Sequence, residues 1–240
     1  MELQDGISLE LYSALVDAIS HELRTPLTSI TGAIEALSNH GSVLGDDAQR
    51  ELMQIALGET RRLNDLIENL LVKARLDAGI LRPRKECQSV PVIIDTALAS
   101  FHHPAEKSQI ALHIQHNLPL IEVDGLLIER VVISLLQYSL KRTPERVIDL
   151  HVVPTIDEVI FEVSDQGDGF PPGDEALLFS DFYPLQNGTS DELGIPHSLS
   201  RKIIEVHDGR IWAKNRAEGG VSVFFALPQT KNCFKANPVQ

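Results

Sequence analysis

The sequence contains little of what disulfide-rich, zinc-binding or membrane-spanning proteins need. Only two of its 240 residues are cysteines, and Cys87 and Cys233 lie far apart without a ligand-type spacing. We therefore expect neither a disulfide framework nor a zinc site, and a reducing compartment fits best. No apolar run approaches the ~20 residues of a membrane helix, and residues 1–10 do not resemble a signal peptide. We expect a cytoplasmic location, with any sensing or membrane region outside this chain.

Positive charge is also scarce. The chain has 21 Lys and Arg residues against 34 Asp and Glu residues, which gives a formal net charge of −13. Nucleic-acid binding draws on clustered Lys and Arg side chains to neutralise phosphates, so the composition argues against a nucleic-acid partner. Hydrophobic residues make up 43% of the chain, which is enough for one large domain or two ordinary ones.

Two long helical patterns fill the first third of the sequence. Between residues 9 and 37, apolar residues recur at alternating steps of four and three, and a second helix is predicted from Asp46 to about Gly79. Two helices of this length cannot bury their apolar stripes fully against each other. The helical hairpin of domain 1–80 is therefore expected to pair with a second copy in a four-helix bundle, which predicts a homodimer.

The pattern changes after residues 81–85. Short β-rich runs are then mixed with helical segments, which predicts an α+β sandwich over residues 81–230. The expected strands are 110–114, 147–153, 159–163, 210–213 and 221–227, and the expected helices are 91–101, 126–140 and 198–206. Short connections predict hairpins between the second and third strands and between the last two. Residues 231–240 are expected to form a flexible tail.

One histidine stands out on the first predicted helix. At 3.6 residues per turn, His21 lies opposite the apolar stripe, so its imidazole should face solvent. Thr25 follows one turn later on the same face, and Glu22 adjoins the histidine in sequence. By exposure statistics alone, a solvated surface histidine is the commoner interpretation of such a position.

The surrounding string adds a more specific signal. Residues 20–27 have the sequence Ser-His-Glu-Leu-Arg-Thr-Pro-Leu, which closely resembles the phosphoacceptor motif of two-component sensor histidine kinases. By this resemblance His21 is the phosphorylated nucleophile and Glu22 is the base that polarises its ring. Thr25 would position water when the bundle dephosphorylates its partner, a response-regulator receiver domain. A neutral imidazole is a competent nucleophile at cellular pH.

A second motif follows a predicted strand. Residues 161–171 have the sequence Phe-Glu-Val-Ser-Asp-Gln-Gly-Asp-Gly-Phe-Pro, in which Gly167 and Gly169 let the backbone approach a ligand closely. Taken alone, the string also fits an ordinary turn, and the chain has no P-loop. It resembles the adenine-binding loop of the histidine-kinase and Hsp90 type of ATP-binding domain. The resemblance implies ATP as cofactor, with Asp165 accepting from the adenine amino group.

Further segments carry the same resemblance. Residues 178–183 are similar to the aromatic motif beside the ATP lid, which assigns Phe182 to the nucleotide site. Lys141 would contact phosphate, and Gly194 would belong to the lid. Residues 123–131 and 212–220 look most like the potassium-responsive Kdp branch of the family. The resemblance covers roughly residues 11–228.

The chain departs from the family at two places in this site. Residues 134–141 are Ser-Leu-Leu-Gln-Tyr-Ser-Leu-Lys, where the family has Asn-Leu-Leu-x-Asn-Ala-x-Lys. Ser134 and Tyr138 thus replace the two asparagines that bind Mg²⁺, an ion that needs hard oxygen ligands, and this puts Mg²⁺ binding in question. In the lid, one of three family glycines remains, and Pro196 cannot donate a backbone N–H to phosphate.

These observations leave several functions open. The first is ATP-dependent autophosphorylation on His21 with transfer to a response-regulator aspartate. The second is a pseudokinase that serves as a dimeric docking or phosphotransfer module with impaired ATP binding, and a phosphatase-biased sensor stands between the two. A mismatch-repair or chaperone ATPase leaves the first helix unexplained. The sequence assigns no residues as metal ligands.

Overall fold

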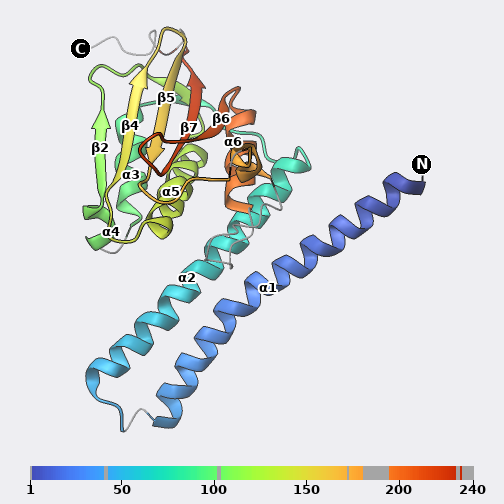
Figure 1. The fold of residues 1–240 in the computed structure, drawn as a ribbon, viewed down its shortest axis with the longest axis vertical. Coiled ribbons are helices and arrows are strands. Elements are labelled where there is room, and N and C mark those ends of the chain that lie inside the picture. Colours follow the sequence, from blue (N-terminus) through green and yellow to red (C-terminus); the bar gives the residue numbers. More distant parts are fainter. Residues whose placement is uncertain are drawn as a thin grey trace. The chain divides into compact units, whose positions relative to one another are not determined.

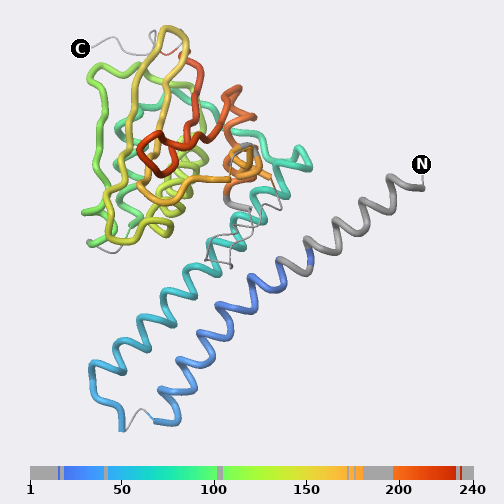
Figure 2. The backbone as a smooth tube through the Cα atoms, viewed as in Figure 1, coloured from blue at the N-terminus to red at the C-terminus, as the bar shows by residue number. Residues whose placement is uncertain are grey.

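The computed structural model describes residues 2–40, 43–101, 104–171, 173–180, 195–230 and 233. The chain divides into two compact units: residues 1–75 belong to one, and the chain from Leu76 to Asp181 and from Pro196 onward forms the other. Figure 2 traces the backbone through both. None of the helices in the described part of the chain combines the length and apolar character that crossing a membrane requires.

The first unit is a helical hairpin, as predicted. Helix α1 spans Glu2–His40 and helix α2 spans Asp46–Asp77 (Figure 1). The acidic side chains of Asp46 and Asp47 lie in the first turn of α2, where they interact favourably with the helix dipole. Both helices follow the predicted periods, and α1 begins several residues earlier than the apolar stripe indicated.

A single hairpin leaves much of its apolar surface uncovered. Large apolar side chains on both helices are exposed in the isolated chain, among them Leu27, Ile34, Leu57 and Leu71. Large apolar side chains left exposed along both helices favour an interaction surface. The pattern is what a hairpin needs if a second copy is to complete its core.

The second unit is built on a five-stranded sheet with the order β2-β4-β5-β7-β6. The strands are β2 (Ile110–Ile114), β4 (Ile148–Pro154), β5 (Glu158–Ser164), β6 (Arg210–Asn215) and β7 (Val221–Pro228). Strand β2 pairs parallel with β4, and the other neighbours are antiparallel. Both predicted hairpins, β4–β5 and β6–β7, are confirmed.

Helices cover one face of this sheet (Figure 1). Helices α3 (Val90–Ala99) and α5 (Gly125–Arg142) lie behind the strands in this view. The unit also contains α4 (Pro104–Ser108), the 3₁₀ helix η1 (Glu175–Phe179) and α6 (Ile195–Val206). The core lies between this layer and the sheet, where alternate residues such as Leu150 and Phe161 are buried against Leu135 and Leu136. The predicted α+β sandwich is confirmed.

A small two-stranded sheet was not predicted. Strand β1 (Glu86–Gln88) pairs antiparallel with β3 (Ile121–Val123). Ile121 also forms an isolated bridge with Gln229, which brings the chain after β7 back against β3. Three-residue strands are too short to show an alternating pattern in the sequence.

This small sheet corrects the interpretation of the cysteines. Cys87 in β1 forms a disulfide with Cys233, with Cα atoms 5.5 Å apart. The expectation that the chain has no disulfide was therefore wrong. The two residues are 146 positions apart, so no local spacing in the sequence indicates the disulfide. The pairing of β1 with β3, and of β3 with the chain after β7, brings them together.

A buried histidine joins α6 to the start of α5. His207 is 1% exposed; its Nε2 accepts from the Asp124 backbone N–H at 3.0 Å, and its Nδ1 donates to the Ile203 carbonyl at 2.7 Å. Burial lowers the pKa of His207 below its ordinary value of 6.5, against the opposing effect of the Ile203 hydrogen bond. The folded protein therefore holds this ring neutral, because a proton on Nε2 would break the contact with Asp124.

We predict that His207 makes this unit sensitive to acid. Below about pH 6.5 His207 is protonated in the unfolded chain but stays neutral in the folded one, because its folded-state pKa is lowered. The free energy of unfolding therefore falls with pH until this lowered folded-state pKa is reached. His207→Gln should make that decline shallower, and should cost about 1 kcal/mol at neutral pH through weaker hydrogen bonds. Urea unfolding at pH 7 and pH 5 measures both effects. His116→Gln, in an exposed turn, is the control, and equal pH slopes for His207→Gln and the unmodified chain would contradict the prediction.

Candidate functional site

The phosphoacceptor-like motif lies on one continuous helix. Helix α1 runs through residues 20–27 with Pro26 inside it and buried. His21 is exposed, which confirms the orientation expected from the helical period. The Thr25 hydroxyl donates to the His21 carbonyl at 3.3 Å, one turn back. Glu22 and Thr25 are both half-buried next to the exposed ring. A nucleophilic imidazole is thus presented to solvent with a carboxylate and a hydroxyl nearby.

Asp165 occupies a fixed position directly after β5. Its side chain is 1% exposed, and Oδ1 accepts from the backbone N–H groups of Gly167 at 2.9 Å and Val221 at 3.2 Å. The pairing of β5 with β7 positions the second donor, and the hydroxyls of Ser164 and Ser222 meet at 2.8 Å beside it. Hydrogen bonds to a carboxylate are stronger than neutral ones, so the loop holds this group firmly.

An arginine at the end of α5 engages the other carboxylate oxygen. Arg142 Nε donates to Asp165 Oδ2 at 3.3 Å, and Nη2 donates to the Asp168 carbonyl. The guanidinium carbon also lies 5.4 Å from the ring centroids of Tyr138 and of Phe170, within cation–π range. In this conformation the Asp165 carboxylate, which is expected to accept a hydrogen bond from the adenine amino group, is therefore paired with Arg142 of the protein itself.

Sequence reasoning missed Arg142. Arg142 adjoins Lys141, which the sequence predicted as a phosphate contact and which is exposed on α5. The available signal was a second basic residue in the last turn of α5, the turn that leads toward the buried carboxylate. Its partner is 23 positions away, so only the packing of α5 on β5 identifies the pair.

The two glycines of the loop fit tightly against neighbouring elements. A Cβ atom at Gly167 would lie 2.9 Å from Thr143 Cγ2, and one at Gly169 would lie 2.8 Å from Asn215 Oδ1. Asn215 Oδ1 accepts from the Phe170 N–H at 2.7 Å, and its Nδ2 donates to the Phe170 carbonyl at 2.9 Å. The glycines are thus required for close packing of the loop itself, in addition to any role toward a ligand.

Residues 134, 138 and 141 lie on one side of α5, where the family places its metal-binding amides. Tyr138 is 4% exposed and packs edge-on against His197 of α6, with ring centroids 4.5 Å apart. Ser134 is half-buried and offers a single hydroxyl. A buried phenol and one hydroxyl do not supply the octahedral oxygen set that Mg²⁺ prefers. The residues present therefore do not fit a bound Mg²⁺ here, and no chemical step is derived through that ion.

Two residues predicted for the nucleotide site, Phe182 and Gly194, lie outside the described residues, as does most of the tail 231–240. Pro196 lies in the first turn of α6, where the absent N–H is tolerated.

An open groove of about 740 Å³ lies elsewhere in this unit, between η1, α6 and β6. Glu175, Arg201, Trp212 and Lys214 are among its lining residues, and Asp165 is not. The groove therefore does not coincide with the candidate nucleotide loop.

Comparison with known families separates the chain into the same two parts. Residues 12–79 match the family described as the His Kinase A (phospho-acceptor) domain. Residues 123–231 match the family described as histidine kinase-, DNA gyrase B-, and HSP90-like ATPase. The first match contains His21, Glu22 and Thr25, and the second contains Asp165 and both glycines of its loop.

Individual relatives agree with the family matches. The chain is 36% identical over 231 residues to the sensor protein KdpD of Escherichia coli, covering 92% of this chain and 25% of that protein. It is 29% identical over 223 residues to the sensor protein KdpD of Clostridium acetobutylicum, covering 91% and 25%. The chain thus spans about a quarter of the length of these curated relatives. The expected likeness to the Kdp branch is confirmed.

A solved structure supports the fold. The histidine kinase ThkA, in complex with the response regulator protein TrrA, superimposes with a TM-score of 0.66 at 24% identity, covering 98% of this chain and 66% of that one. At this identity the likeness establishes the fold alone.

Proposed function

This chain belongs to the two-component sensor histidine kinases, and from that premise we propose that ATP phosphorylates His21 and that an aspartate of a response-regulator receiver domain then takes the phosphoryl group. The observation that carries the proposal is the exposed His21 imidazole within an intact phosphoacceptor motif on α1. The complex of the related fold with a response regulator supports the choice of partner.

The proposed chemistry needs few groups. A ring nitrogen of His21 attacks the γ-phosphorus, the bond to the bridging oxygen breaks, and ADP leaves. Glu22 acts as the base: it polarises the ring and takes the ring proton as the N–P bond forms. In the second step a receiver carboxylate oxygen attacks the same phosphorus, the N–P bond breaks, and the proton returns from Glu22 to give neutral His21. Thr25, one turn along α1, orients water for the reverse task of dephosphorylating the regulator.

The adenine side of the proposal rests on Asp165. For Asp165 to accept from an adenine amino group, the contact from Arg142 has to be exchanged for one from the nucleotide, while the N–H groups of Gly167 and Val221 remain in place. Breaking a buried charge pair is costly unless the new ligand compensates for it. Weak nucleotide binding follows from this competition.

The same contacts favour a second candidate, in which ATP use is impaired and the phosphatase or docking role dominates. Arg142 on Asp165 and the buried Tyr138 ring both oppose a metal-bridged triphosphate. Calorimetric titration with ATP, with and without Mg²⁺, separates the candidates. Weak binding with little dependence on Mg²⁺ supports the second, and micromolar Mg²⁺-dependent binding supports full kinase activity.

Dimerisation belongs to the proposal as well. We infer that residues 1–80 form the dimerisation and phosphoacceptor domain and that residues 81–230 form the nucleotide-binding domain. The support for dimerisation is the apolar surface that remains exposed on both helices of the hairpin. Two such hairpins together would bury these side chains in a four-helix bundle.

We predict that Leu71→Glu weakens the dimer roughly 10- to 100-fold, because a carboxylate would have to be buried in an apolar interface. Leu71 is 50% exposed in the single chain, so the substitution leaves the hairpin itself intact. Sedimentation at micromolar concentration measures the change, and circular dichroism verifies helix content. Leu126→Glu, at a leucine that is 77% exposed on α5, is the matched control. A chain that is already monomeric before substitution would contradict the proposal.

A further inference from the structure

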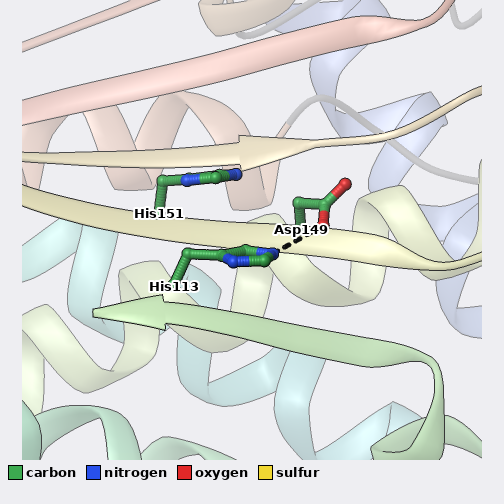
Figure 3. Close-up of side chains that lie close together, drawn as sticks. All are labelled: His113, Asp149 and His151. Carbon is green, nitrogen blue, oxygen red and sulfur yellow. Dashed lines mark hydrogen bonds and ion pairs between the residues drawn. The ribbon is translucent and has the colours of Figure 1, made fainter. Parts of the chain in front are cut away.

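Three potential metal ligands meet on the sheet, on side chains that the proposed function does not use (Figure 3). They are His113 on β2 and Asp149 and His151 on β4. His113 and His151 stand directly opposite each other in the parallel register. Asp149 precedes His151 by two positions, so both project from the same face of β4. The strand pairing itself thus brings the three groups together.

Their geometry is compact. The two imidazole rings are stacked with centroids 4.2 Å apart and an interplanar angle of 12°. His113 Nε2 lies 2.9 Å from Asp149 Oδ1. One ligand atom from each residue lies within 4.8 Å of the others, and within the described residues this is the one group of three or more His, Cys, Asp or Glu side chains that meets such a condition.

The group lies on the face of the sheet that is open to solvent. Ile148, Leu150 and Val152, which alternate with Asp149 and His151 along β4, are fully buried under the helices. The ligand residues point the other way, and the side chains of His113 and Asp149 are 47% and 25% exposed. Strand β2 is also an edge strand of the sheet. An ion can therefore reach the group without opening the core.

From this arrangement we propose that His113, Asp149 and His151 bind one divalent transition-metal ion of the Zn²⁺ class. Two imidazole nitrogens and one carboxylate oxygen suit Zn²⁺ and its neighbours, whereas Mg²⁺ and Ca²⁺ prefer oxygen ligands. Bond lengths of about 2.0–2.2 Å place tetrahedral ligand atoms about 3.3–3.6 Å apart. Ligand atoms that are now farther apart than this have to approach one another, and the 2.9 Å contact between His113 Nε2 and Asp149 Oδ1 has to open slightly. The exposed His113 ring has room to tilt. Water completes the coordination.

A second carboxylate stands beside the group. Glu162 of β5 is the register partner of His151 and projects from the same face. Its Oε1 accepts from the Ser164 hydroxyl at 2.9 Å, which fixes its position. Its negative charge favours a cation next to His151. The site is separate from His21 and from the Asp165 loop in its residues and in its chemistry.

The test is a titration of the untagged chain with Zn²⁺ in competition with a chromophoric chelator. Buffer without reductant keeps the Cys87–Cys233 bond intact and its thiols out of the measurement. We expect one Zn²⁺ ion to bind per chain, with saturation. His113→Ala and His151→Ala should each weaken Zn²⁺ binding roughly 10- to 100-fold, because even the loss of a group that only supports a metal ligand lowers metal affinity by that much. His116→Ala, at the exposed histidine in the turn after β2, should bind as the unmodified chain does.

Asp149→Asn provides a variant of nearly the same shape that keeps the strand and removes the charged ligand. It should also weaken Zn²⁺ binding, and Zn²⁺ should raise the melting temperature of the unmodified chain and not of this variant. Equal Zn²⁺ affinity in the unmodified chain and in His113→Ala/His151→Ala would overturn the proposal. So would the absence of saturable binding, which would leave the three side chains as an ion pair and a ring stack between two strands.

Discussion

His21→Gln should lose the phosphoryl label completely. The glutamine side chain is polar and of similar reach, but it has no ring nitrogen that can attack phosphorus. Because His21 is exposed on α1, its replacement should leave the helix and its packing unchanged. The measurement uses labelled ATP with the chain alone and, in parallel, with an active histidine kinase acting in trans. Label that the unmodified chain acquires in either reaction should be labile to acid.

A second histidine on the same helix supplies the control. His40 is also exposed and lies in the last turn of α1, and His40→Gln should retain the full label. Retention of label in His21→Gln would remove His21 from the mechanism.

The second large effect is expected at α5. Ser134→Asn combined with Tyr138→Asn should raise ATP affinity about 10-fold or more and make binding require Mg²⁺, because two amide oxygens return to the face that now carries a hydroxyl and a buried phenol. Removing the Tyr138 ring also withdraws one of the two aromatic partners of Arg142. Arg142 is then more easily displaced from Asp165. Calorimetric titration of both proteins with ATP, with and without Mg²⁺, measures the gain.

This substitution has a cost in stability. Tyr138 is 4% exposed and packs against His197, so the smaller amide leaves a void and should cost about 2–4 kcal/mol. The titration therefore belongs well below the melting temperature of the variant. Tyr138→Phe is the matched control, because it keeps the ring and adds no metal ligand, and it should show no gain. Micromolar Mg²⁺-dependent ATP binding by the unmodified chain would contradict the explanation that Ser134 and Tyr138 impair the metal and nucleotide site.

The elements that sequence predicted well are those with a long regular period. The apolar periods of the first 79 residues predicted α1 and α2, and short β-rich runs predicted β2, β4, β5, β6 and β7. Strands β1 and β3 have three residues each, which is too few for a period. The disulfide depends on those two strands, and for that reason it escaped prediction as well.

The functional residues divide in the same way. The exposure of His21 follows from its angle around a single helix, and local geometry was sufficient to predict it. The contact between Arg142 and Asp165 depends on how α5 packs against the end of β5, which no local pattern encodes. The meeting of His113 with His151 depends on the register of a parallel strand pair that is distant in sequence.

The central claim is that the phosphoryl group resides on the imidazole of His21. The most direct measurement is tandem mass spectrometry at neutral pH on the unmodified chain, after incubation with ATP and Mg²⁺ and, in parallel, with an active histidine kinase. The account predicts an acid-labile phosphoryl group that fragmentation assigns to His21 and to neither Ser20 nor Thr25. An acid-stable phosphoryl group on Ser20 or Thr25, or a phosphohistidine at any other position, would contradict it.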